Sequence, residues 1–222
     1  MNELELRQAI KDAGVELVKS NLVQGTWGNI SVRLDKKHML VTPSGLDYIM
    51  LRPEDMVKVN IETLEYEGHV KPTSERKIHA AIYRERDDIN AVIHSHPFYS
   101  SSMACARHQL PVISSDMLKM VLGDVRVGSY GMPSTAKLTK GTLTALKGRN
   151  ACFMANHGIV ACYSDLDGAF KVCKLIEDLS RVFIERETLR YTGKETFSQS
   201  DLITVFRNRK KYKLKSINGG LN

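Results

Sequence analysis

The sequence predicts a single α/β domain. Its 222 residues are 42% hydrophobic and 26% charged, a composition typical of one well-packed globular unit. Short apolar runs with strand character alternate with longer segments in which apolar residues repeat at helical spacing. No internal repeat and no low-complexity linker divides the chain. We therefore expect one domain over residues 1–212, followed by a flexible basic tail at 213–222.

The N-terminal half is expected to open with an amphipathic helix over residues 3–20. Leu6, Ile10 and Leu17 belong to its apolar stripe. Glycine and proline turns then separate short alternating runs of strand type. The elements expected after the first helix are a turn at 25–29, strands at 30–34 and 39–42, a turn at 43–45, a helix at 74–86 and a strand at 91–96.

The C-terminal half is expected to be dominated by a long helix over residues 165–189, whose broad apolar face packs across the sheet. Ser134 is expected to cap a second helix, and the strands around the turn at 156–158 are expected to pair. The elements expected before and after the long helix are helices at 99–106, 116–122 and 134–146, strands at 125–130, 150–154 and 159–163, and a terminal helix at 198–212.

Two histidines one residue apart stand at the end of the strand expected over 91–96. Side chains at i and i+2 of a strand share a face, so His94 and His96 present two imidazoles side by side. Further ligands are expected from Glu75, at the start of a helix, and from His157, in a turn after an apolar run. Histidine nitrogen and carboxylate oxygen are zinc ligands, and catalytic sites keep an exchangeable position. These four residues predict a catalytic metal site.

Small hydroxyls and glycines next to this site predict an anion cradle. Ser44 and Gly45 lie in one turn, and Thr73 and Ser74 precede a helix whose N-terminal N–H groups and dipole favour a phosphate. Each turn can also be an ordinary structural turn that connects two strands, and Ser74 can simply be the N-cap of the helix. His79, four residues after Glu75, is a fifth metal candidate, for which we favour a core or supporting role.

Composition argues against several other classes of function. The net charge of +7 comes largely from six lysines and arginines after residue 205, so we expect a solvated tail or an anionic small substrate and no nucleic acid. No apolar run approaches the roughly 18 residues of a membrane span, and the N-terminus does not resemble a signal peptide. The four cysteines show no CxxC spacing and are expected to be reduced. A cytoplasmic protein is expected.

The order and spacing of these motifs resemble the class II, zinc-dependent sugar-phosphate aldolases of the fuculose-phosphate aldolase and ribulose-phosphate 4-epimerase type. The resemblance runs from the first helix to about Tyr212. It implies a central, mainly antiparallel sheet flanked by helices, and a homotetramer with each site near a subunit interface. It implies one Zn²⁺ per subunit and a phosphorylated sugar as substrate. The residues that it assigns are Glu75, His94, His96 and His157 as zinc ligands, and Asn29, Ser44, Gly45, Thr73 and Ser74 as phosphate ligands.

The resemblance is greatest to the L-fuculose-1-phosphate aldolase branch, because the epimerases carry an aspartate where Glu75 stands. The implied reaction cleaves a ketose 1-phosphate to dihydroxyacetone phosphate and a short aldehyde through a zinc-stabilised enediolate, with Glu75 as general acid and base. Fuculose-phosphate aldolase has a catalytic tyrosine in a region occupied here by Ser114, Ser115 and Asp116. The donor that protonates the leaving alkoxide is therefore not identified. Tyr212 resembles a tyrosine of that enzyme's mobile tail.

Four alternative functions stay open. Within enzymes these are a 5-deoxypentulose-1-phosphate aldolase, a ribulose-phosphate 4-epimerase and a methylthioribulose-phosphate dehydratase. A non-catalytic binding module like the head domain of the cytoskeletal adducins is the fourth. That head domain resembles the family but lacks its metal ligands, whereas all four are present here.

Overall fold

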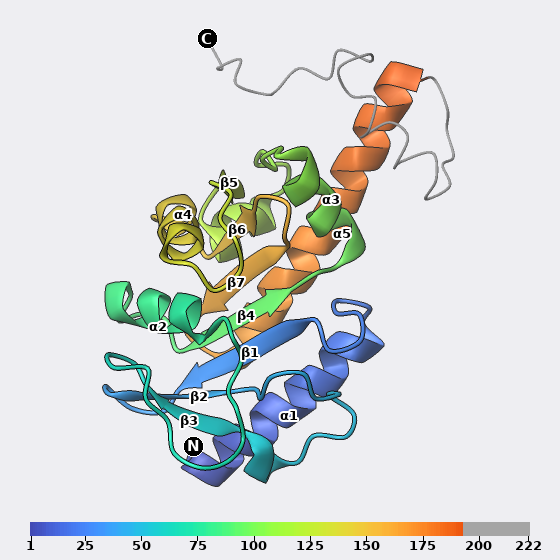
Figure 1. Cartoon of the computed structure of the whole chain (residues 1–222). Helices are drawn as coiled ribbons and strands as arrows, with labels where there is room; N and C mark the ends of the chain where they lie inside the picture. The colour runs from blue at the N-terminus through green and yellow to red at the C-terminus, as the bar shows by residue number, and fades with distance from the viewer. Residues whose placement is uncertain (193–222) are drawn as a thin grey trace.

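A seven-stranded sheet in the order β3-β2-β1-β4-β7-β6-β5 runs through the computed structural model, which describes residues 1–192 (Figure 1). Neighbouring strands are antiparallel, except that β5 and β6 are parallel. The mainly antiparallel sheet predicted from the sequence is therefore confirmed. The strands are β1 (Gly28–Arg33), β2 (His38–Val41), β3 (Val57–Asn60), β4 (Ala91–Ser95), β5 (Arg126–Gly128), β6 (Ala151–Met154) and β7 (Ile159–Tyr163).

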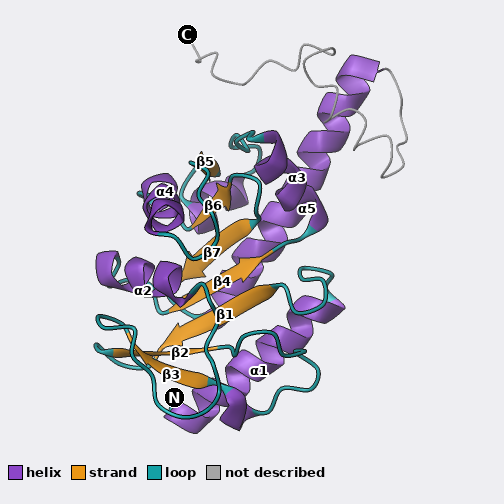
Figure 2. Ribbon diagram, in the orientation of Figure 1, coloured by secondary structure: helices purple, strands orange, loops and turns teal. Residues whose placement is uncertain are grey.

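Helices cover both faces of the sheet (Figure 2). Helices α1, α3 and α5 pack on one face and α2 and α4 on the other, so the fold has three layers. The helices are α1 (Glu3–Lys19), α2 (Arg76–Glu85), α3 (Phe98–Ala106), α4 (Ala136–Leu146) and α5 (Leu166–Thr192), with short turns η1 (Pro53–Asp55) and η2 (Met117–Val121).

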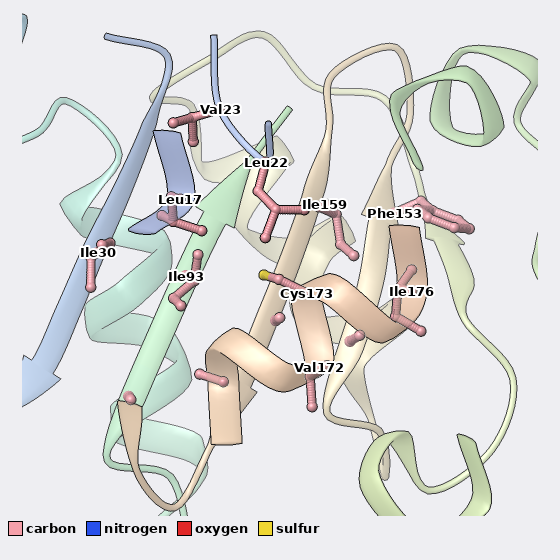
Figure 3. Packing of buried hydrophobic residues seen from close by; sticks show 14 of the residues in the cluster. Leu17, Leu22, Val23, Ile30, Ile93, Phe153, Ile159, Val172, Cys173 and Ile176 are labelled. Carbon is pink, nitrogen blue, oxygen red and sulfur yellow. The ribbon is translucent and has the colours of Figure 1, made fainter. Parts of the chain in front are cut away.

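The alternation of side chains along β4 divides the core in two. Ile93 faces the layer of α5, whereas Val92 and His94 face the opposite layer, which holds α2. Figure 3 shows Val172 and Cys173 of α5 close to the strands on the Ile93 side. The long helix therefore packs across the sheet as predicted. The other face carries a second hydrophobic cluster, formed with α2 and α4, and also the polar residues of α2.

Three elements differ from the expectations. Strand β3 was not predicted, although Val57 and Val59 alternate with polar residues and are buried at the edge of the sheet. The N-cap of α4 is Thr135, which accepts from the N–H of Leu138, so the expected cap at Ser134 is wrong. The helix expected over 116–122 is a single π-helical turn that ends at a left-handed Leu122.

Several expectations concern residues that the structure does not describe. The terminal helix at 198–212, the basic tail at 213–222 and Tyr212 all lie outside the described residues. Within residues 1–192, every helix is too short or too polar to span a membrane. The four cysteines are free thiols as predicted, with Cys105 exposed and the other three buried.

Candidate metal centre and active site

Strand β4 and its neighbours position the first histidine. His94 is buried, and its Nδ1 donates to the carbonyl oxygen of Ile159 at 2.8 Å, where β7 begins. Because a carbonyl can only accept, this bond fixes the proton on Nδ1 of a neutral His94 and leaves a lone pair on Nε2. His94 thus presents a ligand nitrogen to the space beside α2.

Three imidazoles meet at this point. The ring centroid of His94 lies 4.5 Å from that of His96 and 4.8 Å from that of His157. The ligand nitrogens of the three residues all lie within 4.8 Å of one another, and the two Nε2 atoms of His94 and His96 are 2.8 Å apart. The structure therefore brings together the three histidines that the sequence analysis selected, from β4, from the residue after it and from the β6–β7 turn.

Glu75 stands beside the histidines at the N-cap of α2, with 6% of its surface exposed. Its Oε2 is 3.0 Å from His94 Nε2, and its Oε1 is 3.5 Å from His157 Nε2. Within residues 1–192, Glu75 Oε1 and His157 Nδ1 are buried without a hydrogen-bond partner. A buried carboxylate oxygen needs a compensating charge or donor, and a divalent cation among three imidazoles supplies one. The donor set fits zinc.

The protonation states match metal binding. Burial raises the pKa of Glu75, but the nearby His94 and His157 and the hydrogen bond from Asn29 outweigh it and hold this pKa below its ordinary value. Burial lowers the pKa of His96 to about 3 and also lowers the pKa of His157. At neutral pH Glu75 is therefore ionised and the imidazoles of His96 and His157 are neutral, which are the forms that bind metals.

A half-buried carboxylate on α5 anchors the segment that follows His96. The chain turns at Pro97 into α3, whose N-terminus has no side-chain cap of its own. Glu177 accepts from the backbone N–H groups of Tyr99 and Ser100, both at 2.8 Å. This contact satisfies two N–H groups at the helix start and ties the end of the histidine motif to the long helix.

The turn that carries His157 requires a glycine next to it. A Cβ atom on Gly158 would lie 2.3 Å from Cδ2 of His96 and 2.5 Å from the carbonyl oxygen of Ser95. Asn156, on the other side of His157, adopts a left-handed φ of 57°. Only a residue without a side chain lets the β6–β7 turn approach the end of β4 so closely, and this approach brings His157 to His96.

Two predicted phosphate-binding turns lie next to each other. Pro43 and Pro72 form an isolated β-bridge, and the N–H of Ser44 donates to the carbonyl of Lys71 at 2.9 Å. Ser44, Gly45 and Ser74 are exposed. Thr73 is buried, and its hydroxyl accepts from the N–H of Glu75 at 3.2 Å. The turns thus form one surface beside Glu75, with Thr73 also supporting the backbone of the catalytic candidate.

Asn29 lies deeper than the other predicted phosphate ligands. Its Nδ2 donates to Glu75 Oε2 at 3.1 Å, and its Oδ1 is 2.5 Å from His79 Nε2. Only 5% of its surface is exposed. Both ends of the Asn29 amide are therefore engaged, its amino group by Glu75 and its oxygen by His79.

Comparison with known proteins identifies the family. The model of the Class II Aldolase and Adducin N-terminal domain matches residues 8–184. The chain belongs to the class II aldolase and adducin family. It is 37% identical over 183 residues to the 5-methylthioribulose-1-phosphate/5-deoxyribulose-1-phosphate aldolase of Rhodospirillum rubrum, which covers 82% of this chain and 81% of that protein. It is 32% identical over 184 residues to the 5-deoxy-D-ribulose 1-phosphate aldolase of Bacillus thuringiensis, which covers 82% of this chain and 86% of that protein.

A solved structure shows the same class II aldolase fold. The structure entitled L-fuculose 1-phosphate aldolase superposes with a TM-score of 0.79 at 32% identity, over 93% of this chain and 96% of that one. The agreement extends over nearly all of the described part of the chain. The sheet order and the helical layers described above are therefore those of a class II aldolase.

Two residues that lie beside the candidate site were not selected from the sequence as site residues. The exposed Trp27 lies with its ring 6.5 Å from that of His96. The Ser134 hydroxyl donates to the Ser74 carbonyl at 3.2 Å, which joins the loop before α4 to one of the turns predicted to bind phosphate. Trp27 directly precedes Gly28-Asn29 in the sequence, and this position could have indicated that it lies near the site. The residues around Ser134 gave no indication that it would contact Ser74. Ser74 itself is not a cap, because α2 begins at Arg76 with Glu75 as its N-cap.

Proposed function

We propose that this chain is a metal-dependent aldolase that cleaves a ketose 1-phosphate to dihydroxyacetone phosphate and a short aldehyde. One observation carries the proposal: in a member of the class II aldolase family, an ionised Glu75 stands beside three clustered histidines, and one of its buried oxygens has no hydrogen-bond partner among the described residues. A binding module of the adducin type has no use for such a cluster. The reaction is that of a lyase.

His94, His96 and His157 would hold the metal, with Glu75 as the ligand that substrate displaces. A zinc ion there would act as a Lewis acid and stabilise the enediolate charge that develops on the dihydroxyacetone phosphate portion. His94 and His96 come from the end of β4 and His157 comes from the turn between β6 and β7, whereas Glu75 is the N-cap of α2. Four protein ligands would close a tetrahedral site, so one would have to leave for substrate, and a carboxylate freed from the metal can act as a general acid and base.

Glu75 would move the proton at C3. In the condensation direction the carboxylate removes a C3 proton of dihydroxyacetone phosphate, and the electron pair of the C–H bond becomes the enediolate. That electron pair then forms the C3–C4 bond with the aldehyde carbon, and the aldehyde oxygen becomes a hydroxyl by taking up a proton. In cleavage the same carboxyl group returns its proton to C3. The low pKa of Glu75 keeps it in the basic form that condensation needs.

The phosphate would lie on the surface formed by Ser44, Gly45, Thr73 and Ser74, with Asn29 at its inner end. This surface adjoins the N-terminus of α2, whose dipole favours an anion. We expect Ser74→Ala to raise the KM for the phosphorylated substrate about tenfold and to leave kcat within about twofold, as removal of one hydrogen bond to a charged group predicts. An unchanged KM would argue against this placement of the phosphate.

Two ketose 1-phosphates are candidate substrates, fuculose 1-phosphate and a 5-deoxypentulose 1-phosphate. The 5-deoxypentulose 1-phosphate is favoured by the relatives at 37% and 32% identity, whose names specify methylthioribulose and deoxyribulose phosphates. Fuculose 1-phosphate is favoured by the solved structure at 32% identity. Both substrates yield dihydroxyacetone phosphate, so the site residues carry out the same chemistry on each. Only the aldehyde differs.

The test uses the condensation reaction with a panel of aldehydes. Lactaldehyde, acetaldehyde and methylthioacetaldehyde are each combined with dihydroxyacetone phosphate, and kcat/KM is measured with and without a chelator. We expect chelator-sensitive condensation, with the preferred aldehyde naming the substrate. Activity only on pentulose 5-phosphates or on methylthioribulose phosphate by loss of water would instead establish the epimerase or the dehydratase. Light scattering on the same sample tests the expected homotetramer.

A further inference from the structure

Strand β1 and helix α2 face each other with two matched rows of side chains. Asn29, Ser31 and Arg33 alternate along β1 and share one face, and Glu75, His79 and Tyr83 are spaced four residues apart along α2. The rows interleave in the order Glu75, Asn29, His79, Ser31, Tyr83, Arg33. A ladder of contacts therefore runs from the candidate catalytic carboxylate along the full length of α2.

The hydrogen bonds of this ladder have a single direction. Because the Glu75 carboxylate only accepts, the Asn29 amide must turn its Nδ2 toward Glu75 and its Oδ1 toward His79. His79 must then carry its proton on Nε2 and accept at Nδ1 from the Ser31 hydroxyl, 2.6 Å away. Ser31 in turn accepts from the Tyr83 hydroxyl at 2.8 Å. Each donor in the ladder has one acceptor, so every hydrogen bond from Glu75 to Tyr83 is consistent with this one orientation of the Asn29 amide.

The ladder is sealed from solvent and fixed at its far end. Asn29, Ser31, His79 and Tyr83 are each at most 5% exposed. Burial lowers the pKa of His79 to about 3, so it stays a neutral imidazole with one donor and one acceptor. The Arg33 guanidinium lies 4.8 Å from the Tyr83 ring centroid and donates to the Tyr83 carbonyl. Because Asn29, Ser31, His79 and Tyr83 are buried, bulk water cannot readily replace a lost partner of these four side chains.

We propose that His79, supported by Ser31 and Tyr83, is a positioning residue that fixes the Asn29 amide and through it the orientation of the Glu75 carboxylate. The inference rests on the proposed function, in which Glu75 transfers the C3 proton. Asn29 holds Oε2 of Glu75, so the unpaired Oε1 is presented to the metal site and to the substrate. The imidazole of His79 hydrogen-bonds to Asn29 and to Ser31, so we expect its effect on Glu75 to pass through Asn29.

The first experiment compares His79→Leu with His79→Gln. Glutamine can keep a donor near the position of Nε2 and so can hold Asn29, whereas leucine cannot. We expect His79→Leu to slow C3 proton exchange of dihydroxyacetone phosphate about tenfold or more, with KM and metal content unchanged, and His79→Gln to recover most of the rate. Thr142→Val removes an equally buried hydroxyl from α4 and serves as the packing control.

Equal losses in the leucine and glutamine variants would overturn the proposal, as would a loss expressed in KM or in metal content. A second measurement does not depend on catalysis. In protein labelled with ¹⁵N-histidine, long-range ¹H–¹⁵N NMR should show His79 as the neutral Nε2–H tautomer at neutral pH, with the signal assigned by its loss in His79→Gln. An Nδ1–H tautomer would overturn the ladder. If the wild-type protein catalyses no exchange, the proposed function has failed, and the tautomer still decides whether the ladder exists.

Discussion

Gly158→Ala should disable the metal site without replacing any of its candidate ligands. The added Cβ would lie 2.3 Å from His96 Cδ2 and 2.5 Å from the Ser95 carbonyl oxygen, whereas ordinary contacts begin at 3.4 Å, so His96 must move by about 1 Å. The φ of Gly158 is not in the left-handed region, so the substitution acts through this contact. Metal–ligand distances tolerate only about 0.2 Å. We therefore expect metal content to fall severalfold and activity to fall with it.

The assay measures bound metal by mass spectrometry after dialysis, together with the free energy of unfolding. Overpacking costs about 1–3 kcal/mol, so some loss of stability is expected as well. Gly141→Ala is the matched control. Gly141 lies in α4, which carries none of the candidate metal ligands, and its added Cβ would lie 2.6 Å from Ser129 Oγ. Full metal content in Gly158→Ala, or an equal loss in Gly141→Ala, would refute the reasoning.

Two further predictions concern stability. Glu177→Ala leaves the N–H groups of Tyr99 and Ser100 without their acceptor, so the free energy of unfolding measured in urea should fall by about 1–3 kcal/mol. The control is Asp178→Ala, at an exposed position, which should change this free energy by less than about 0.5 kcal/mol. Equal effects of the two substitutions would contradict the capping role of Glu177. Burial lowers the pKa of His79 to about 3, so below pH ~6.5 the unfolded chain binds a proton at this residue that the folded protein does not bind. The free energy of unfolding therefore decreases as the pH is lowered. Between about pH 7 and pH 5 the metal-free wild type should lose about 2 kcal/mol more than His79→Gln, and parallel curves for the two proteins would show that His79 does not titrate in this way.

The part of the site that follows strand periodicity could be predicted from the sequence. His94 and His96 are two residues apart in a strand ending, so their shared face followed from geometry alone, and the structure places their Nε2 atoms 2.8 Å apart. The paired strands β6 and β7 fixed the turn of His157 in the same way. Glu75 was expected as a further ligand from its residue type and its place at a helix start, and the family resemblance implied the same. The sequence alone does not show which strand α2 covers, so the contact itself could not be derived from it.

The features that sequence could not reveal depend on contacts between distant segments. The spacing of Asn29 and Ser31 and of His79 and Tyr83 is visible in the sequence, but their interleaving needs the packing of α2 on β1. The cap of α4 moved to Thr135 because Ser134 takes a left-handed φ and donates to Ser74. Strand β3 was missed although Val57 and Val59 alternate, because a four-residue edge strand gives little periodic signal.

The central claim is that Glu75, beside a metal held by the three histidines, removes and returns the C3 proton of dihydroxyacetone phosphate. Hydrogen exchange at C3 in D₂O, followed by NMR, tests it without any assumption about the aldehyde. We expect stereospecific exchange that a chelator stops and that Glu75→Gln abolishes while most of its bound metal is retained. Absence of exchange in the metal-loaded wild type, or undiminished exchange in Glu75→Gln, would contradict the account.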